Sequence, residues 1–245
     1  MDLPLEILEL SLIKRGLKKR KLIKEPYLEV GCGDGLNLEQ FSELGMSGVG
    51  IDVSSEAVKI VFEKHLKNVQ IVRTDFLTYK DFQLRSKVIF MLNLLEHTHE
   101  DIKFIQKAAE ILPQGGFLVI AVPAHSKSYG FADANAGHIR RYDATELRQK
   151  LQEAGLTVDE WLEVGFPINR TYTWFFNFLN RNKPQTPIET QIEVSGIRNK
   201  DGYYGGIFDL VAKIVFPILK IIIHVDQLFI HSHLGNNFVV FARKV

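Results

Sequence analysis

The stretch Tyr27-Leu28-Glu29-Val30-Gly31-Cys32-Gly33-Asp34-Gly35-Leu36 indicates how the rest of the chain is organised. Its apolar start predicts a buried strand, which then breaks into a turn with glycine at every second position. Glycine has no Cβ atom, so the backbone of this turn can approach a ligand closely. Residues 36–44 predict a helix whose first N–H groups point back into the turn. Together these features predict a nucleotide-binding cradle.

Composition limits the alternatives. A chain of 245 residues with 46% apolar residues suits one α/β domain with an elaboration, or two small domains. The net charge of +1 gives no general field for nucleic acid, so we expect no such partner. A single cysteine, Cys32, excludes an intrachain disulfide and suits a reducing compartment. Acidic residues precede the basic ones at the N-terminus, unlike a secretory signal, so we expect a cytoplasmic protein.

Strand and helix patterns alternate regularly after the glycine turn. Further strands are predicted at 48–53, 68–73, 87–92, 117–122, 156–164 and 237–243. This alternation predicts a Rossmann-like, doubly wound parallel sheet of seven strands, with a helical insert between the last two. In such sheets ligands bind at the carboxyl ends of the strands. Polar or turn-forming residues fall at five such ends, which predicts a site there: Gly31, Asp52, Asp75, Asn93 and Pro123.

The pattern divides the chain into four parts. Residues 1–25 are predicted as a helical segment, 26–165 as the core, 166–235 as a helical cap and 236–245 as the last strand of the core. We expect the first helix, at about 3–24, to pack on the edge of the domain; its basic residues leave a membrane surface as the alternative. Asp143 and Glu146 predict a capping-box start for a helix that reaches Ala154.

Glycine spacing narrows the identity of the nucleotide. A dinucleotide fingerprint requires Gly-x-Gly-x-x-Gly, whereas the third glycine here comes one position early and Leu36 takes the last slot. Glu29 precedes the first glycine by two residues, where a carboxylate can meet an ammonium group. A cofactor with both an adenosine and an amino acid accounts for both features.

These motifs resemble those of the class I S-adenosylmethionine-dependent methyltransferases. Residues 28–35 (Leu-Glu-Val-Gly-Cys-Gly-Asp-Gly) are similar to the first motif of that family, and Asp52 to the acid that ends its second strand. Thr74-Asp75-Phe76 resembles its adenine-contacting segment. Residues 90–97 (Phe-Met-Leu-Asn-Leu-Leu-Glu-His) look like the fourth-strand motif of the quinone methyltransferases, and residues 112–118 (Leu-Pro-Gln-Gly-Gly-Phe-Leu) like the turn before the fifth strand. The resemblance covers residues 26–165 and the last strand.

The resemblance implies S-adenosylmethionine as the cofactor and a role for each matching residue. Glu29 would face the methionyl amino group, Asp52 the ribose hydroxyls and Asp75 the adenine amino group. The glycines would let the backbone approach the methionine and ribose of the cofactor. The residues next to the glycines and the carboxylates would line the rest of the site. Taken singly, Asp52 and Asp75 are more often helix caps or turn formers, and Glu29 an exposed strand residue. The expected cofactor-binding residues are Glu29, Gly31, Cys32, Gly33, Gly35, Asp52, Val53, Asp75, Phe76, Asn93 and Leu94.

A general base is needed only if the acceptor is a poorly acidic hydroxyl. His97 and His125 follow the fourth and fifth predicted strands, and His138 lies in the next loop, so these three are the candidate catalytic residues. Each is singly more often structural or merely exposed. Glu96, His97, His99 and Glu100 match no strong metal-ligand spacing, so we expect no metal.

Arg140, Arg141 and Tyr142 predict a grip on an acidic or phosphorylated acceptor, or alternatively surface ion pairs of the two arginines with a tyrosine packed on the sheet. In the insert, an aromatic cluster at 172–178 precedes an apolar helix predicted at 207–230. That helix suits a core-packed cap first, and then a homodimer contact or a peripheral membrane contact. A narrow polar stripe runs along it: Asp209, Lys213, Lys220, His224, Gln227 and His231.

The sequence therefore predicts methyl transfer from S-adenosylmethionine to a small-molecule acceptor. We favour an oxygen over a nitrogen or carbon, because of the histidines and the quinone-like fourth motif, and a hydrophobic or lipid-like acceptor, because of the insert. One alternative is a catalytically silent cofactor-binding protein that acts as a partner or membrane-surface module. Another is a nicotinamide-dependent dehydrogenase, which the glycine spacing and the later motifs oppose.

Overall fold

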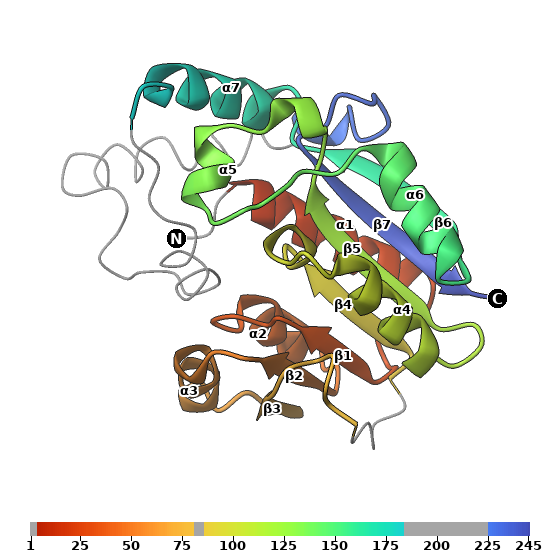
Figure 1. Ribbon diagram of the computed structural model, residues 1–245. Helices are drawn as coiled ribbons and strands as arrows, with labels where there is room; N and C mark the ends of the chain where they lie inside the picture. Colours follow the sequence, from red (N-terminus) through yellow and green to blue (C-terminus); the bar gives the residue numbers. More distant parts are fainter. Residues whose placement is uncertain (1–3, 81–85, 184–224) are drawn as a thin grey trace.

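The computed structural model describes residues 4–80, 86–183 and 225–245. Seven strands form one sheet in the order β3-β2-β1-β4-β5-β7-β6 (Figure 1). The order reverses between β1 and β4, which pair in parallel, so the switch point lies beside the glycine turn. The strands are β1 (Tyr27–Val30), β2 (Gly48–Asp52), β3 (Val69–Arg73), β4 (Val88–Leu92), β5 (Phe117–Pro123), β6 (Leu156–Val164) and β7 (Asn237–Lys244).

The seven-stranded Rossmann-like sheet is confirmed, but the expectation that it is parallel throughout is wrong for its last strand. β7 lies between β5 and β6 and runs antiparallel to both. The antiparallel direction follows from the position at which the segment before β7 returns to the sheet. The Asn236 N–H donates to the Val164 carbonyl over 2.6 Å, at the end of β6. A strand that starts at this carboxyl edge has to run back across the sheet.

Helices cover both faces of the sheet, which is buried on each side. Alternate residues of β1 point to opposite faces, so Tyr27 belongs to one core cluster and Leu28 to the other. The first cluster includes residues of the first three helices, and the second includes residues of α4 and α6. The helices are α1 (Pro4–Lys19), α2 (Leu36–Glu43), α3 (Ser55–Glu63), α4 (Asp101–Ile111), α5 (Phe131–Asn135), α6 (Ala144–Glu153) and α7 (Ile168–Asn180).

Helix α1 packs its apolar stripe into the core, with Leu8, Leu12 and Leu17 each at most 2% exposed. Just beyond its end, Arg20 forms ion pairs with Asp159 and Glu160 of β6. The favoured expectation of a helix packed on the domain therefore holds. α1 contributes to the same core as the strands, rather than forming a separate layer.

The predicted capping box at the start of α6 is wrong. Asp143 occupies the N-cap position but makes no side-chain bond to the helix. Its two oxygens instead accept from the backbone N–H and the hydroxyl of Ser126. Glu146 pairs with Lys150, one turn further along α6. Ser126, in the preceding loop, has thus replaced the helix backbone as the hydrogen-bond partner of Asp143.

The loop at 124–141 is more ordered than its polar sequence suggested, because it contains a 3₁₀ turn at Ser126–Ser128 and helix α5. The aromatic cluster of the insert forms α7, which contacts α5: the Ala132 N–H donates to Asn177 Oδ1 over 2.8 Å. The predicted helix at 207–230 and its stripe residues Asp209, Lys213, Lys220 and His224 lie almost wholly outside the described residues. Gln227 and His231 are described, and His231 is exposed.

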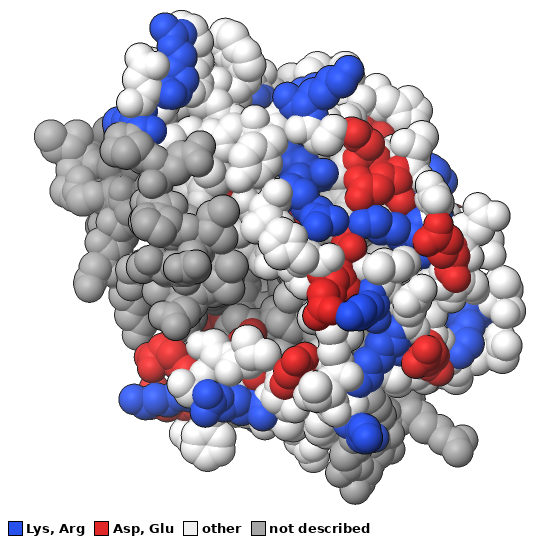
Figure 2. Space-filling model, in the orientation of Figure 1, with Lys and Arg blue, Asp and Glu red and all other residues white. Residues whose placement is uncertain are grey.

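Surface charge on the visible face is mixed. Figure 2 shows Lys and Arg interspersed with Asp and Glu over the part of the chain that the structure describes. Such a surface does not provide the single-sign field that favours nucleic acid. Among the described helices, none combines the length and the hydropathy that a membrane crossing requires.

Candidate functional site

The glycine turn follows β1 in a conformation that requires glycine. Gly31, Gly33 and Gly35 have φ angles of 70°, 52° and 75°. The N–H groups of Gly31 and Cys32 both donate to the Ile51 carbonyl, over 2.8 and 3.1 Å, which ties the turn to β2. A Cβ atom on Gly31 would lie only 2.6 Å from a methyl of Leu94. The turn therefore packs directly against the end of β4, at the switch point.

Cys32 is part of the wall of the turn. It is 5% exposed, and burial raises the pKa of its thiol. Its Sγ atom would be 3.0 Å from a Cβ placed on Gly50, so it fills space between β1 and β2. Among the residues expected at the cofactor, Cys32 contributes packing and the shape of the backbone.

Asp52 ends β2 and faces the turn. Its Oδ2 accepts from the Gly33 N–H over 2.8 Å, and its Oδ1 accepts from the Ser54 N–H over 2.9 Å. Each carboxylate oxygen has a second lone pair, and the residue is only partly buried, so both oxygens can accept further bonds. Val53 follows with a 65% exposed side chain. The carboxylate is thus fixed at the turn, with an apolar side chain beside it.

Glu29 is the most unusual residue of the cradle. It is 1% exposed, and its Oε1 accepts from Asn37 Nδ2 of α2 over 2.8 Å. Its Oε2 is buried without a hydrogen-bond partner among the described residues. Burial raises the pKa of this carboxyl to about 8. A buried acceptor with no donor is costly, which fits a site that an ammonium group completes.

Asp75 and Phe76 lie at the end of β3. Asp75 is exposed, and its Oδ1 accepts from the Leu77 N–H over 2.8 Å, as a turn former would. Phe76 is 2% exposed and packs against Phe104 with ring centroids 5.6 Å apart. The exposed Asp75 carboxylate and the backbone of the packed Phe76 leave room for the expected contact with the adenine of the cofactor.

Asn93 ends β4 with a φ of 52°, which is uncommon for a residue other than glycine. Its exposed side chain bonds to the buried Glu9 and Asn237, a contact that the motifs did not indicate. Glu9 of α1 accepts from Asn93 Nδ2 over 3.3 Å and from Asn237 Nδ2 over 2.7 Å. Burial raises the pKa of Glu9 to about 8. The available signal was an acidic residue on the apolar stripe of a helix, beside Leu8 and Leu12.

His97 and His138 meet in space, although 41 positions separate them. Their rings are in edge contact, 5.0 Å apart, and His97 Nδ1 lies 3.0 Å from the Gly137 carbonyl oxygen. Burial lowers the pKa of His97 to about 4, so this ring stays neutral. His138 Nδ1 lies 3.1 Å from Asp133 Oδ1. In each of these two predicted bases, the Nδ1 atom therefore faces an oxygen atom of the protein.

Glu96 adjoins these rings. It is fully buried, both of its oxygens lack a hydrogen-bond partner among the described residues, and burial raises its pKa to about 7. Glu96, His97 and His138 each place one ligand atom within 4.8 Å of the others, so a cation could bind among them. His99 and Glu100, which the sequence placed beside Glu96, are exposed and do not belong to this group.

Arg140, Arg141 and Tyr142 face inward. Arg141 is 5% exposed and donates to Asp133 Oδ1 over 2.7 Å, and the Tyr142 hydroxyl donates to Asp101 Oδ2 over 2.8 Å. Arg140 also pairs with Asp101, over 3.0 Å. Of the two alternatives from the sequence, this geometry corresponds to ion pairs with a packed tyrosine, and the Arg141 pair is buried.

His125 lies on the other half of the carboxyl edge. Its Nε2 atom is 3.5 Å from Oε2 of Glu163 on β6, and its side chain is 27% exposed. Burial lowers its pKa. The sequence indicated His125 but not Glu163, because the order of the strands, and not their spacing, brings these residues together.

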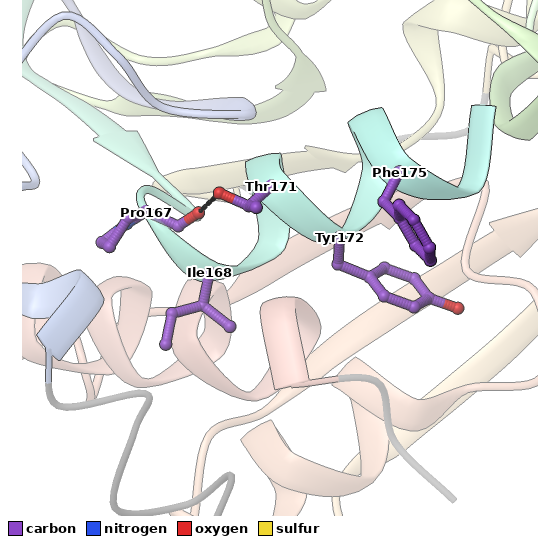
Figure 3. A pocket seen from close by; sticks show the side chains of 5 residues that line it. All are labelled: Pro167, Ile168, Thr171, Tyr172 and Phe175. Atoms are coloured by element: carbon purple, nitrogen blue, oxygen red, sulfur yellow. Dashed lines mark hydrogen bonds between the residues drawn. The ribbon is translucent and has the colours of Figure 1, made fainter. Parts of the chain in front are cut away.

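An apolar hollow of about 420 Å³ opens at the start of α7. Its lining is Pro167, Ile168, Thr171, Tyr172 and Phe175. Figure 3 shows Tyr172 and Phe175 projecting from α7 toward the same side, and the bond from Thr171 Oγ1 to the Pro167 carbonyl. The hollow lies at the start of α7, the helix that follows β6 in the chain.

Comparison with known proteins indicates the family of this chain. The family model described as "Methyltransferase domain" matches residues 6–160. A ubiquinone biosynthesis O-methyltransferase of Pelagibacter ubique is 31% identical over 120 residues, which are 47% of this chain and 49% of that protein. A protein of the same name from Nitrosospira multiformis is 24% identical over 176 residues, covering 62% and 72%. The chain thus matches about half of the Pelagibacter relative's length.

The fold is also similar to that of solved methyltransferases. The crystal structure of a magnesium protoporphyrin IX methyltransferase from Synechocystis PCC 6803, with bound SAH, superposes with a TM-score of 0.53 and 14% identity. The match covers 62% of this chain and 73% of that one. At this identity the similarity concerns the fold alone.

Proposed function

Because this chain belongs to the methyltransferase-domain family and is a class I S-adenosylmethionine-dependent methyltransferase, we propose that it methylates a hydroxyl oxygen of a small hydrophobic acceptor. The unpartnered Oε2 atom of Glu29, buried beside the glycine turn, supports S-adenosylmethionine as the cofactor. A dinucleotide has no ammonium group to place there, whereas the methionyl end of S-adenosylmethionine has one. The assignment of the eleven cofactor-binding residues is part of the proposal.

The residues of the cradle fit this group. Glu29 would hold the ammonium, and Asp52, fixed by the Gly33 and Ser54 N–H groups, would accept from the ribose hydroxyls. Asp75 and Phe76 would adjoin the adenine, and the Asn93 backbone the methionine. When bound, the cofactor supplies a methyl group already activated by a positive sulfur. Holding the acceptor in line with that methyl can contribute about 7–11 kcal/mol.

The acceptor half of the edge supports the proposal of a hydrophobic hydroxyl compound. Exposed aromatic side chains of α7 include Tyr172, Trp174 and Phe175, at 50%, 66% and 52% exposure. They can contact an apolar chain or ring. His125, on that half of the edge, can take a proton from a hydroxyl. The names of the two relatives, which are O-methyltransferases of ubiquinone biosynthesis, agree with this chemistry.

Two measurements on the full chain test the proposal. Isothermal titration with S-adenosylhomocysteine should show binding, and NAD should show none. Transfer of tritiated methyl from S-adenosylmethionine should then occur to dodecyl 3,4-dihydroxybenzoate, but not to dodecylamine or to the dimethoxy ester. Cofactor binding without transfer to any hydroxyl compound of a broad panel would favour a catalytically silent binding protein. Transfer to the amine alone would overturn the choice of oxygen.

A further inference from the structure

One buried carboxylate lies between two histidines on the acceptor half of the carboxyl edge. Glu163 of β6 is 3% exposed. Its Oε2 lies 3.5 Å from His125 Nε2, and its Oε1 lies 3.2 Å from His233 Nδ1. Oε2 and His125 Nε2 are shielded from solvent, and neither has a hydrogen-bond partner in the described part of the chain. A shift of a few tenths of an ångström would bring these two atoms within hydrogen-bond distance.

The backbone at His125 is strained in a way that holds its ring in place. Its φ and ψ angles are 64° and 94°, a backbone conformation that residues other than glycine rarely adopt. Two contacts maintain this conformation. The His125 N–H donates to the Tyr142 carbonyl over 2.8 Å, and the ring packs edge-on against Phe238, 5.6 Å between centroids. Strain of this kind is common at sites where a side chain has to point in one direction.

Hydrogen bonds connect His125 to the cofactor half of the edge. The neighbouring Ala124 N–H donates to the Asn236 carbonyl over 2.8 Å. The next residue, Asn237, donates from Nδ2 to Asn93 Oδ1 over 3.4 Å. Asn237 also pairs with Pro123 on one side and Val164 on the other. β7 therefore lies between β5, which ends just before His125, and β6, which contains Glu163. Its first residue, Asn237, contacts Asn93, which follows β4.

We propose that His125 is the general base that takes the acceptor's hydroxyl proton, and that Glu163 is the positioning residue that orients and charges it. This inference rests on the proposed function. As the acceptor oxygen bonds to the methyl carbon, the carbon–sulfur bond breaks and its electron pair stays on sulfur. The hydroxyl proton passes to Nδ1 of the His125 imidazole, since Nε2 faces Oε2 of Glu163. The resulting imidazolium faces the Glu163 carboxylate, and solvent later takes the proton.

The charged groups around His125 are consistent with this role. Burial and the nearby Arg170 of α7 lower the pKa of His125, while Glu163 and Asp143 raise it. The net shift is downward, so the ring is neutral near pH 7, as a base must be. His233, whose side chain is 85% exposed, faces the other oxygen of Glu163 and can stabilise its ionised form.

Rate measurements against pH test the pair, with the alkyl catechol ester and tritiated S-adenosylmethionine as the probe reaction. In the wild type, kcat should rise with pH along a limb that follows the pKa of His125. In Glu163→Gln this limb should move to lower pH, because the loss of a negative charge lowers that pKa, and the plateau should fall at least tenfold. Glu163→Asp should restore part of the plateau. The affinity for S-adenosylhomocysteine should stay unchanged in both variants.

His125→Asn should lower the plateau by about 10²- to 10⁴-fold, the usual contribution of a general base. Its residual rate should rise through the pKa of the catechol itself. His231→Asn is the matched control, since His231 is an exposed histidine outside the His125–Glu163 pair, and should behave as the wild type. An unmoved limb in Glu163→Gln, or a wild-type plateau in His125→Asn, would overturn the proposal.

A second readout does not depend on turnover. In the full chain labelled at histidine, the His125 NMR signal, assigned by its loss in His125→Asn, should titrate at lower pH in Glu163→Gln than in the wild type. An equal pKa in the two proteins would overturn the role of Glu163. If the wild type binds S-adenosylhomocysteine but methylates no hydroxyl compound, the proposed function fails and the base role with it. The titration would still support or overturn the coupling of Glu163 to His125.

Discussion

Asn37 Nδ2 donates to Glu29 Oε1 over 2.8 Å, and this bond leaves the second oxygen of Glu29 buried beside the glycine turn. The contact joins the first turn of α2 to β1, so it orients the carboxyl before any ligand is present. A rigid acceptor of this kind lowers the cost of ordering when a donor binds.

Binding of S-adenosylhomocysteine should release a proton from Glu29 near pH 7. The carboxyl has a pKa of about 8 and is largely protonated there, whereas the bound ammonium favours the ionised form. Affinity should therefore rise with pH up to about 8. Calorimetry in two buffers of different ionisation enthalpy measures the release. Glu29→Gln should abolish both the release and the pH dependence; their persistence would contradict the assignment.

Loss of the Asp52 carboxylate should weaken cofactor binding without unfolding the chain. Asp52→Ala removes the acceptor of the Gly33 and Ser54 N–H groups as well as the proposed ribose contact. We expect at least a tenfold rise in the Kd for S-adenosylhomocysteine, which corresponds to about 1.4 kcal/mol. Glu56→Gln, an exposed acid in the first turn of α3, is the control. Equal affinities in the two variants would exclude Asp52 from the site.

Stability should fall as pH rises, in part because of Glu9. Its pKa is about 8 in the folded chain and near 4.5 when unfolded, so the folded state binds the proton more tightly. The stabilisation is complete below pH 4.5 and is lost as pH rises through about 8, with a slope of up to about 1.4 kcal/mol per pH unit. Urea unfolding between pH 6 and 9 measures this slope. Glu9→Gln should reduce it, and an unchanged slope would contradict the burial of this carboxyl.

The two adjacent arginines should differ in their effect on stability. Arg141→Met leaves Asp133 buried without its guanidinium partner, which costs about 3–5 kcal/mol. Arg140→Met should cost about 1 kcal/mol or less, since Arg140 is partly exposed and Lys150 still pairs with Asp101. Urea unfolding of both variants compares them directly. A similar loss in the two would mean that the Arg141 pair is not buried.

Two glycines with nearly equal φ angles separate backbone strain from steric contact. Gly31→Ala strains a φ of 70° and also places a Cβ 2.6 Å from Leu94. Gly45→Ala strains a φ of 76° but meets no atom within 4 Å. We expect Gly31→Ala to lose more stability and most of its cofactor affinity, whereas Gly45→Ala keeps that affinity. Normal cofactor binding by Gly31→Ala would overturn the close approach at the turn.

Much of the fold follows from local patterns. The predicted strand at 156–164 has the bounds that the structure shows, and Ser54 caps α3 locally by accepting from the Ala57 N–H. Features with nonlocal partners were harder to predict. Asp143 bonds to Ser126 instead of its own helix, and α7, inside the segment predicted as a helical cap, contacts α5 through Asn177 and Ala132.

The chain's own order of residues was enough to predict the glycine turn, the strands and the carboxylates at their ends, because these depend on neighbours a few positions apart. Only the tertiary structure decided which polar groups meet. Glu9 reaches Asn237 across 228 positions, and His125 faces Glu163 because β7 brings β5 and β6 to its two sides. Such pairs depend on strand order and burial, which local spacing does not encode. The glycine turn and the strand-end carboxylates were therefore predictable, and the nonlocal pairs Glu9–Asn237 and His125–Glu163 were not.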